Sequence, residues 1–101
     1  MLSLLTIVCS KFETINLLCA NYSILMNTEL LLNFGKIIRE LRVEKNISQE
    51  ELGFRSNLHR TYIGMIERGE KNITLENIEK LSKGLDVSMK LIFEKLNKIH
   101  Q

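Results

Sequence analysis

A short run of polar side chains, His59-Arg60-Thr61-Tyr62, has the residue types that recognise a partner through hydrogen bonds. The planar guanidinium of Arg60 can donate two parallel hydrogen bonds to a phosphate or to O6 and N7 of guanine. Thr61 and Tyr62 add hydroxyl groups that both donate and accept. Base reading is favoured for Arg60 over a phosphate contact, and the alternative for Tyr62 is a partly buried packing residue.

The same sequence shows none of the residue patterns that we would expect of an enzyme active site. We find no paired catalytic carboxylates in a plausible pocket, no Cys–His pair and no glycine-rich phosphate loop. Cys9 and Cys19 lie near the N-terminus, far from His59 and His100, so ordinary thiols are favoured over a disulfide or a zinc site. We therefore expect no enzymatic activity, no metal, no cofactor and no small-molecule ligand.

Length and composition suit one small domain. The chain has 101 residues, 45% of them hydrophobic, which is enough for one modest core. The net charge is only +2, so any nucleic-acid binding must use a local patch of positive charge rather than a uniform field. No apolar run approaches the roughly 18 residues of a membrane span, and we expect a cytoplasmic protein.

The first 25 residues differ in composition from the rest of the chain. They carry one basic residue, Lys11, and one acid, Glu13, out of 14 basic and 12 acidic residues in total. No positive charge precedes the apolar start, as a secretory signal would require, and neither helical nor strand periodicity is clear. Our hypothesis is that Met26 is the start used in the cell. Residues 1–25 are then upstream sequence or a poorly ordered tail; the alternative is a helical or strand extension packed on the domain 26–101.

Five helices are predicted after residue 28. The first runs from Glu29 to about Lys45, with Thr28 as its N-cap. The second, over 48–56, opens with a capping box in which Ser48 and Glu51 exchange hydrogen bonds. Its mid-helix Gly53 indicates that another helix approaches closely.

The other three helices follow from turn and cap residues. Asn57 supplies a tight turn into a helix over 59–68, which Gly69 ends. Thr74 caps a helix over 74–85, and Ser88 caps the last one. The predicted inner face of the 74–85 helix consists of Leu75, Ile78, Leu81 and Leu85. The expected fold class is therefore all-α.

Two short helices joined by a tight turn inside a bundle have the geometry of a helix-turn-helix. Leu41-Arg42, the stretch Ile47 to Leu52 and the stretch Tyr62 to Gly69 resemble the Cro/C1-type (XRE-like) helix-turn-helix family, over about residues 30–93. Within it, the stretch Ser56 to Ile63 followed by Ile66-Glu67-Arg68 is most similar to the controller proteins of restriction–modification systems. The implied fold is a five-helix, lambda-repressor-like DNA-binding domain.

The resemblance implies a dimeric regulator that binds a pseudo-palindromic DNA operator. Its functional residues should form three groups: residues that read bases, residues that contact the DNA backbone, and residues of the dimer interface. The expected base-reading residues are Arg60, Thr61, Tyr62 and Met65. The expected DNA-backbone contacts are Gln49, His59, Lys71, Asn72 and Thr74. The last helix should divide its apolar residues between core and dimer interface, with the interface formed by Met89, Ile92, Phe93 and Leu96; the alternative is a monomer that buries this face. Arg42 and Glu67 are expected to form a structural pair.

The chain departs from these families at a few positions. Gly53 replaces a usual Ala, and Asn57 and Asp86 replace usual glycines. His59 stands where controller proteins commonly have Asp, and histidine is a weaker N-cap. RNA polymerase is a further candidate partner, through Glu79 or Lys83. An antitoxin-type repressor, a phage repressor and a helical protein-interaction module remain the alternative functions.

Overall fold

The computed structural model describes the backbone of residues 12–100 and the side chains of residues 28–99. Its helices are α2 (Phe12–Glu44), α3 (Gln49–Ser56), α4 (Arg60–Glu67), α5 (Leu75–Leu85) and α6 (Met89–His100). The described part of the chain contains no strand, which confirms the predicted all-α class. Among the described helices, none is long and apolar enough to cross a membrane.

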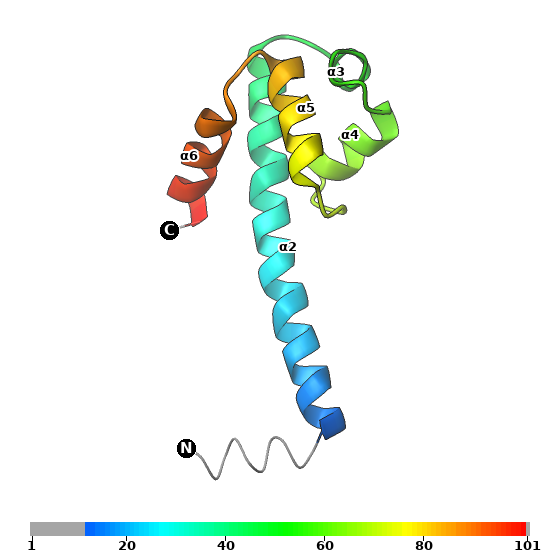
Figure 1. The fold of residues 1–101 in the computed structure, drawn as a ribbon, viewed down its shortest axis with the longest axis vertical. Helices are drawn as coiled ribbons and strands as arrows, with labels where there is room; N and C mark the ends of the chain where they lie inside the picture. The colour runs from blue at the N-terminus through cyan, green and yellow to red at the C-terminus, as the bar shows by residue number, and fades with distance from the viewer. Residues whose placement is uncertain (1–11, 101) are drawn as a thin grey trace.

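The long helix α2 is the axis of the fold (Figure 1). It begins at Phe12 and not at Glu29, so the predicted N-cap at Thr28 is wrong, and Thr28 lies inside the helix. No Gly or Pro lies between Phe12 and Thr28, so no strong helix breaker separates the two parts. The side chains of Cys9, Cys19 and Met26 lie outside the described residues, and the hypothesis that Met26 is the start stays a prediction.

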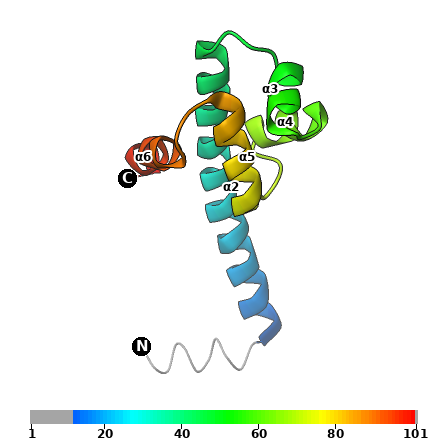
Figure 2. The ribbon, with the colours of Figure 1, turned by 45° about the horizontal axis from the view of Figure 1, so that its top comes forward.

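Two helices, α4 and α6, pack against α2, and α3 packs against α4 and α5. Figure 2 shows α3 and α4 on one side of α2, α6 on the other side, and α5 in front of it. Every helix contributes to one apolar core, which consists of Phe34, Ile37, Ile38, Leu41, Leu52, Ile63, Ile66, Ile78, Leu81, Leu85 and Ile92. The expectation that Leu75 lies in this core is wrong, because Leu75 is the first residue of α5 and is 68% exposed.

Hydroxyl caps fix where three of the helices begin. The Ser48 hydroxyl accepts a 3.0 Å hydrogen bond from the Glu51 amide, and Thr74 and Ser88 accept equivalent bonds at 3.1 Å. The capping box is only half formed, because Glu51 Oε1 accepts from Arg55 Nε at 2.9 Å instead of returning to Ser48. The predicted caps at these three helices are otherwise confirmed.

The turn between α3 and α4 is unusually close-packed. Asn57 takes the left-handed conformation, with φ of 57°, as the tight turn predicted at this residue requires. A Cβ built on Gly53 would lie 2.6 Å from the Leu58 carbonyl oxygen and 3.3 Å from the Arg60 amide nitrogen. The close approach predicted at Gly53 is therefore made by the turn and by the start of α4, which fixes the angle between the two helices.

Candidate nucleic-acid interface

An ion pair between α2 and α4 holds the C-terminal end of α4. Arg42 donates to Glu67 twice, from Nε to Oε2 at 2.7 Å and from Nη2 to Oε1 at 3.0 Å. Arg42 Nη1 also donates to the Ile47 carbonyl at 2.9 Å. The structure thus brings Arg42 and Glu67 together as expected, and the Glu67 side chain is only 3% exposed, so the pair is shielded from solvent.

Gln49 joins the same network. Its Nε2 donates a 3.0 Å hydrogen bond to Glu67 Oε1, which ties the start of α3 to the end of α4. The expectation for Gln49 was a phosphate contact. An amide nitrogen carries two hydrogens, so Gln49 can hold Glu67 and still offer one donor to a phosphate.

The other end of α4 begins at His59. The His59 Nδ1 accepts a 3.1 Å hydrogen bond from the Thr61 amide, so histidine does act as the N-cap. Because Nδ1 accepts this hydrogen bond, the ring nitrogen that remains to donate to a partner is Nε2. His59 can therefore cap α4 through one ring nitrogen and offer the Nε2–H donor at the exposed start of the helix.

Arg60 and Thr61 are exposed at this end of α4, as a base-reading role requires. Arg60 Nη1 lies 3.6 Å from Oε2 of Glu50 on α3, and these side chains are 67% and 77% exposed. Sequence reasoning missed Glu50. The only signal was an acidic residue in the first turn of α3, which is common at helix N-termini.

Tyr62 is less available than Arg60. It is half-buried against the core, and its hydroxyl oxygen accepts a 3.0 Å hydrogen bond from Asn77 Nδ2 on α5. The partly buried packing alternative is therefore supported, although the phenolic O–H can still donate to DNA. Met65, one turn further along α4, is also half-buried. Asn77 was not singled out from the sequence.

The loop after α4 carries the remaining predicted backbone contacts. Lys71, Asn72 and Thr74 are all exposed. Just before them, Arg68 Nε donates to Glu70 Oε2 at 2.7 Å, and this hydrogen bond lowers the pKa of the Glu70 carboxyl and raises the pKa of Arg68. The two charges offset each other, so Lys71 supplies the positive charge of the loop.

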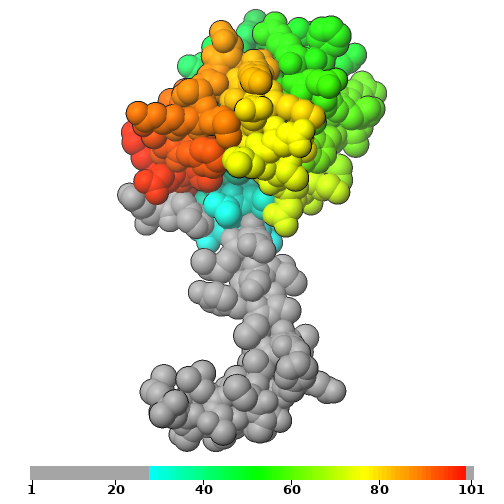
Figure 3. Space-filling model, viewed as in Figure 1, coloured from blue at the N-terminus to red at the C-terminus, as the bar shows by residue number. Residues whose placement is uncertain are grey.

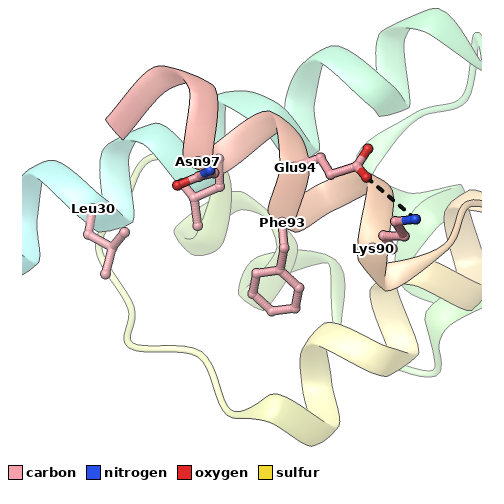
Figure 4. A pocket seen from close by; sticks show the side chains of 6 residues that line it. Leu30, Lys90, Phe93, Glu94 and Asn97 are labelled. Atoms are coloured by element: carbon pink, nitrogen blue, oxygen red, sulfur yellow. Dashed lines mark ion pairs between the residues drawn. The ribbon is translucent and has the colours of Figure 1, made fainter. Parts of the chain in front are cut away.

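A second surface lies on α6 and the neighbouring part of α2. Figure 4 shows a shallow groove lined by Leu30, Lys90, Phe93, Glu94, Leu96 and Asn97. Phe93 is 41% exposed, and Met89 and Leu96 are half-buried. Ile92 is fully buried in the core of the single chain, so it has no surface to offer a partner and leaves the predicted interface. Figure 3 shows α5 between α6 and the α3–α4 unit, which keeps the two surfaces apart.

Together, the short α3, the tight turn and the exposed start of α4 define a helix-turn-helix DNA-binding protein. A sequence model of the family described as helix-turn-helix matches residues 38–92, and the chain belongs to this family. It is a DNA-binding transcriptional regulator of the XRE-like type.

Relatives within this family indicate which kind of regulator the chain is similar to. The chain is 52% identical over 66 residues to Control protein C.BamHI of Bacillus amyloliquefaciens, covering 64% of this chain and 82% of the relative. It is 37% identical over 71 residues to Control protein C.MunI of a Mycoplasma species, covering 69% and 96%.

The solved structures give the same result. The crystal structure of the restriction–modification controller protein C.AhdI from Aeromonas hydrophila matches with a TM-score of 0.61 and 48% identity, covering 62% of this chain and 96% of that one. The wild-type controller protein C.Esp1396I matches with a TM-score of 0.65 and 45% identity, covering 68% and 90%. The resemblance to restriction–modification controller proteins is confirmed.

Proposed function

We propose that this protein controls a restriction–modification system by binding, as a homodimer, a pseudo-palindromic operator near the genes it regulates. The observation that carries the proposal is the start of α4, where Arg60 and Thr61 are exposed. The opposite end of α4 is held by the Arg42–Glu67 pair, so the exposed end projects from a rigid support. In helix-turn-helix proteins the N-terminal residues of the second helix contact base edges in the major groove.

The proposed roles follow from exposure and chemistry. Arg60 donates to guanine O6 and N7, and Thr61 meets a base edge or a thymine methyl. Tyr62 and Met65, which are half-buried, contact the DNA only at the margin of the base-reading surface. Contacts with phosphates fix the position of α4 on the duplex, and the proposed contacts come from Gln49, His59, Lys71, Asn72 and Thr74.

The groove on α6 is the proposed dimer interface. Phe93 and Leu30 are partly exposed, and Met89 and Leu96 lie half-buried beside them, so a second copy of the same surface can cover all four. A two-fold axis through this interface presents two α4 helices to one face of the DNA, about 34 Å apart. The operator should then have two related half-sites about ten base pairs apart, centre to centre.

Because its target is chromosomal or plasmid DNA, we propose that the protein acts in the cytoplasm.

Whether the protein activates or represses a gene depends on where the operator lies relative to the promoter of that gene. Glu79 and Lys83 lie exposed on α5, with Lys83 Nζ 3.6 Å from Glu79 Oε1. They form a candidate contact with RNA polymerase at an adjacent promoter.

Selection from random double-stranded DNA with the full chain tests this function. The expected result is enrichment of one motif with two-fold symmetry, bound by a species of twice the chain mass. Binding without enrichment of any motif would contradict sequence-specific regulation and favour the protein-interaction alternative. Enrichment of one unrepeated half-site, bound by a monomer, would contradict only the dimer.

A further inference from the structure

We infer that Glu50 determines how well the protein distinguishes its operator from other DNA, by opposing contacts between Arg60 and phosphate. This inference rests on the proposed function and adds a residue that the base-reading and phosphate-contacting groups do not contain. Glu50 and Arg60 lie on different helices, at the starts of α3 and α4. Their charged groups are 3.6 Å apart and both are exposed, beside the end of α4 that the proposed function places against the DNA.

Glu50 faces one edge of the Arg60 guanidinium, which leaves the other edge available to contact DNA. Nη1 faces Glu50 Oε2, whereas Nε and Nη2 form the second edge of the planar group. That second edge can donate two parallel hydrogen bonds, as a guanine contact requires. Arg60 can therefore read guanine without giving up Glu50, and the carboxylate limits the directions in which the guanidinium can point.

Phosphate differs from guanine in its charge. The O6 and N7 atoms of guanine are neutral acceptors, so they can share a guanidinium with a carboxylate. A phosphate bound to the same guanidinium would bring a second anion close to Glu50, and like charges repel. In a non-specific complex, where Arg60 has no guanine to contact, Glu50 therefore weakens the phosphate contact that remains.

The size of this effect is limited by exposure. Pairs of solvent-exposed charges interact weakly and are screened by salt. We therefore expect a several-fold effect at low salt that shrinks as salt is added. An acidic side chain near phosphates also reduces the counterion release on which non-specific affinity depends.

The test measures dissociation constants for a mixed-sequence duplex that lacks the selected motif, with the full chain at about 50 mM and 200 mM salt. Glu50→Gln keeps the shape of the side chain and removes its charge. Glu51→Gln is the matched control, since it makes the same charge change on the same helix, where Glu51 pairs with Arg55 and not with Arg60. Both substitutions are repeated in an Arg60→Ala background.

We expect Glu50→Gln to bind the mixed-sequence duplex about three- to tenfold more tightly at the lower salt concentration. Glu51→Gln should change this affinity by less than about twofold. The gain from Glu50→Gln should disappear when Arg60 is alanine. On the selected operator the same variant should gain less, so that the ratio of specific to non-specific affinity falls.

Equal gains from the two glutamine variants would show a bulk charge effect and overturn the inference. A gain that persists without Arg60, or an unchanged non-specific affinity, would also overturn it. A fall in operator affinity alone would also overturn the inference, and would indicate that Glu50 accepts a hydrogen bond from a base. The measurements on the mixed-sequence duplex do not depend on the motif, so a failure of this inference can be distinguished from a failure of the proposed function, in which the unaltered chain selects no motif.

Discussion

Arg42 on α2 and Glu67 at the end of α4 are joined by two hydrogen bonds of 2.7 and 3.0 Å. Since Gln49 on α3 donates to the same carboxylate, one buried acid connects three helices. The orientation of α4 relative to the rest of the domain therefore depends strongly on Glu67.

Replacing Glu67 with alanine should lower the free energy of unfolding by about 3 kcal/mol, because it leaves the mostly buried Arg42 guanidinium without its partner. Urea denaturation of Glu67→Ala, Arg42→Ala and the double variant measures this. The double variant should lose less stability than the sum of the single variants. The control is Glu51→Ala, which breaks an exposed pair and should cost less than about 1 kcal/mol. Additive losses at Arg42 and Glu67 would contradict the role of the pair.

Two buried serines allow a matched comparison of hydrogen bonding. Ser56 is 3% exposed, and its Oγ has no hydrogen-bond partner within the described part of the chain. Ser82 is 4% exposed, and its Oγ donates to the Glu79 carbonyl at 2.7 Å. Ser56→Ala should leave stability unchanged or raise it by up to about 1 kcal/mol, because it removes a desolvated hydroxyl.

Ser82→Ala, in contrast, should lower stability by about 1 kcal/mol, since a formed hydrogen bond is lost. Thermal and urea unfolding of the two variants under one buffer condition make the comparison. A loss at Ser56 as large as the loss at Ser82 would mean that the Ser56 hydroxyl has a partner in solution.

The hydrogen bond between Tyr62 and Asn77 links α4 to α5. Tyr62→Phe should lower the free energy of unfolding by about 1 kcal/mol, and Asn77→Ala should cost little more once Tyr62 is Phe. Operator affinity should fall less than tenfold, because the ring keeps its packing and Arg60 keeps its position. A larger loss of operator affinity without a loss of stability would show that the phenolic O–H contacts the DNA directly.

The proposed dimer interface at the α6 groove can be tested through the oligomeric state. Phe93→Glu should convert the dimer into a monomer, since it places a charge where a second copy would bury an apolar ring. Analytical ultracentrifugation measures the mass. Phe54→Glu is the matched control, because Phe54 is 84% exposed on α3 and far from the α6 groove in sequence and fold. A dimer that survives Phe93→Glu would contradict an interface at this groove.

Local signals predicted much of this fold. Ser48, Thr74 and Ser88 marked helix starts correctly, because a hydroxyl cap acts on amides only two or three residues away. The start of α2 was missed for a related reason. Thr28 has a side chain suited to capping, but the chain before it contains no residue that forces the helix to begin there.

The details of the site depended on contacts between helices. The Arg42–Glu67 pair followed from a family resemblance, whereas the bonds from Gln49 to Glu67 and from Asn77 to Tyr62 join residues distant in the sequence. No local periodicity predicts which side chains meet across a bundle. Ile92 is a second example. Its position on the last helix suited an interface, but packing of α6 against α2 and α5 buries it.

The central claim is that the exposed start of α4 reads bases through Arg60. The most direct measurement compares dissociation constants of Arg60→Ala and the unaltered chain on the selected operator and on a mixed-sequence duplex of equal length. We expect at least about a tenfold loss on the operator, as a guanine contact would give, and a much smaller loss on the other duplex. Equal losses on the two duplexes would show that Arg60 contacts phosphate, and would contradict base reading by Arg60.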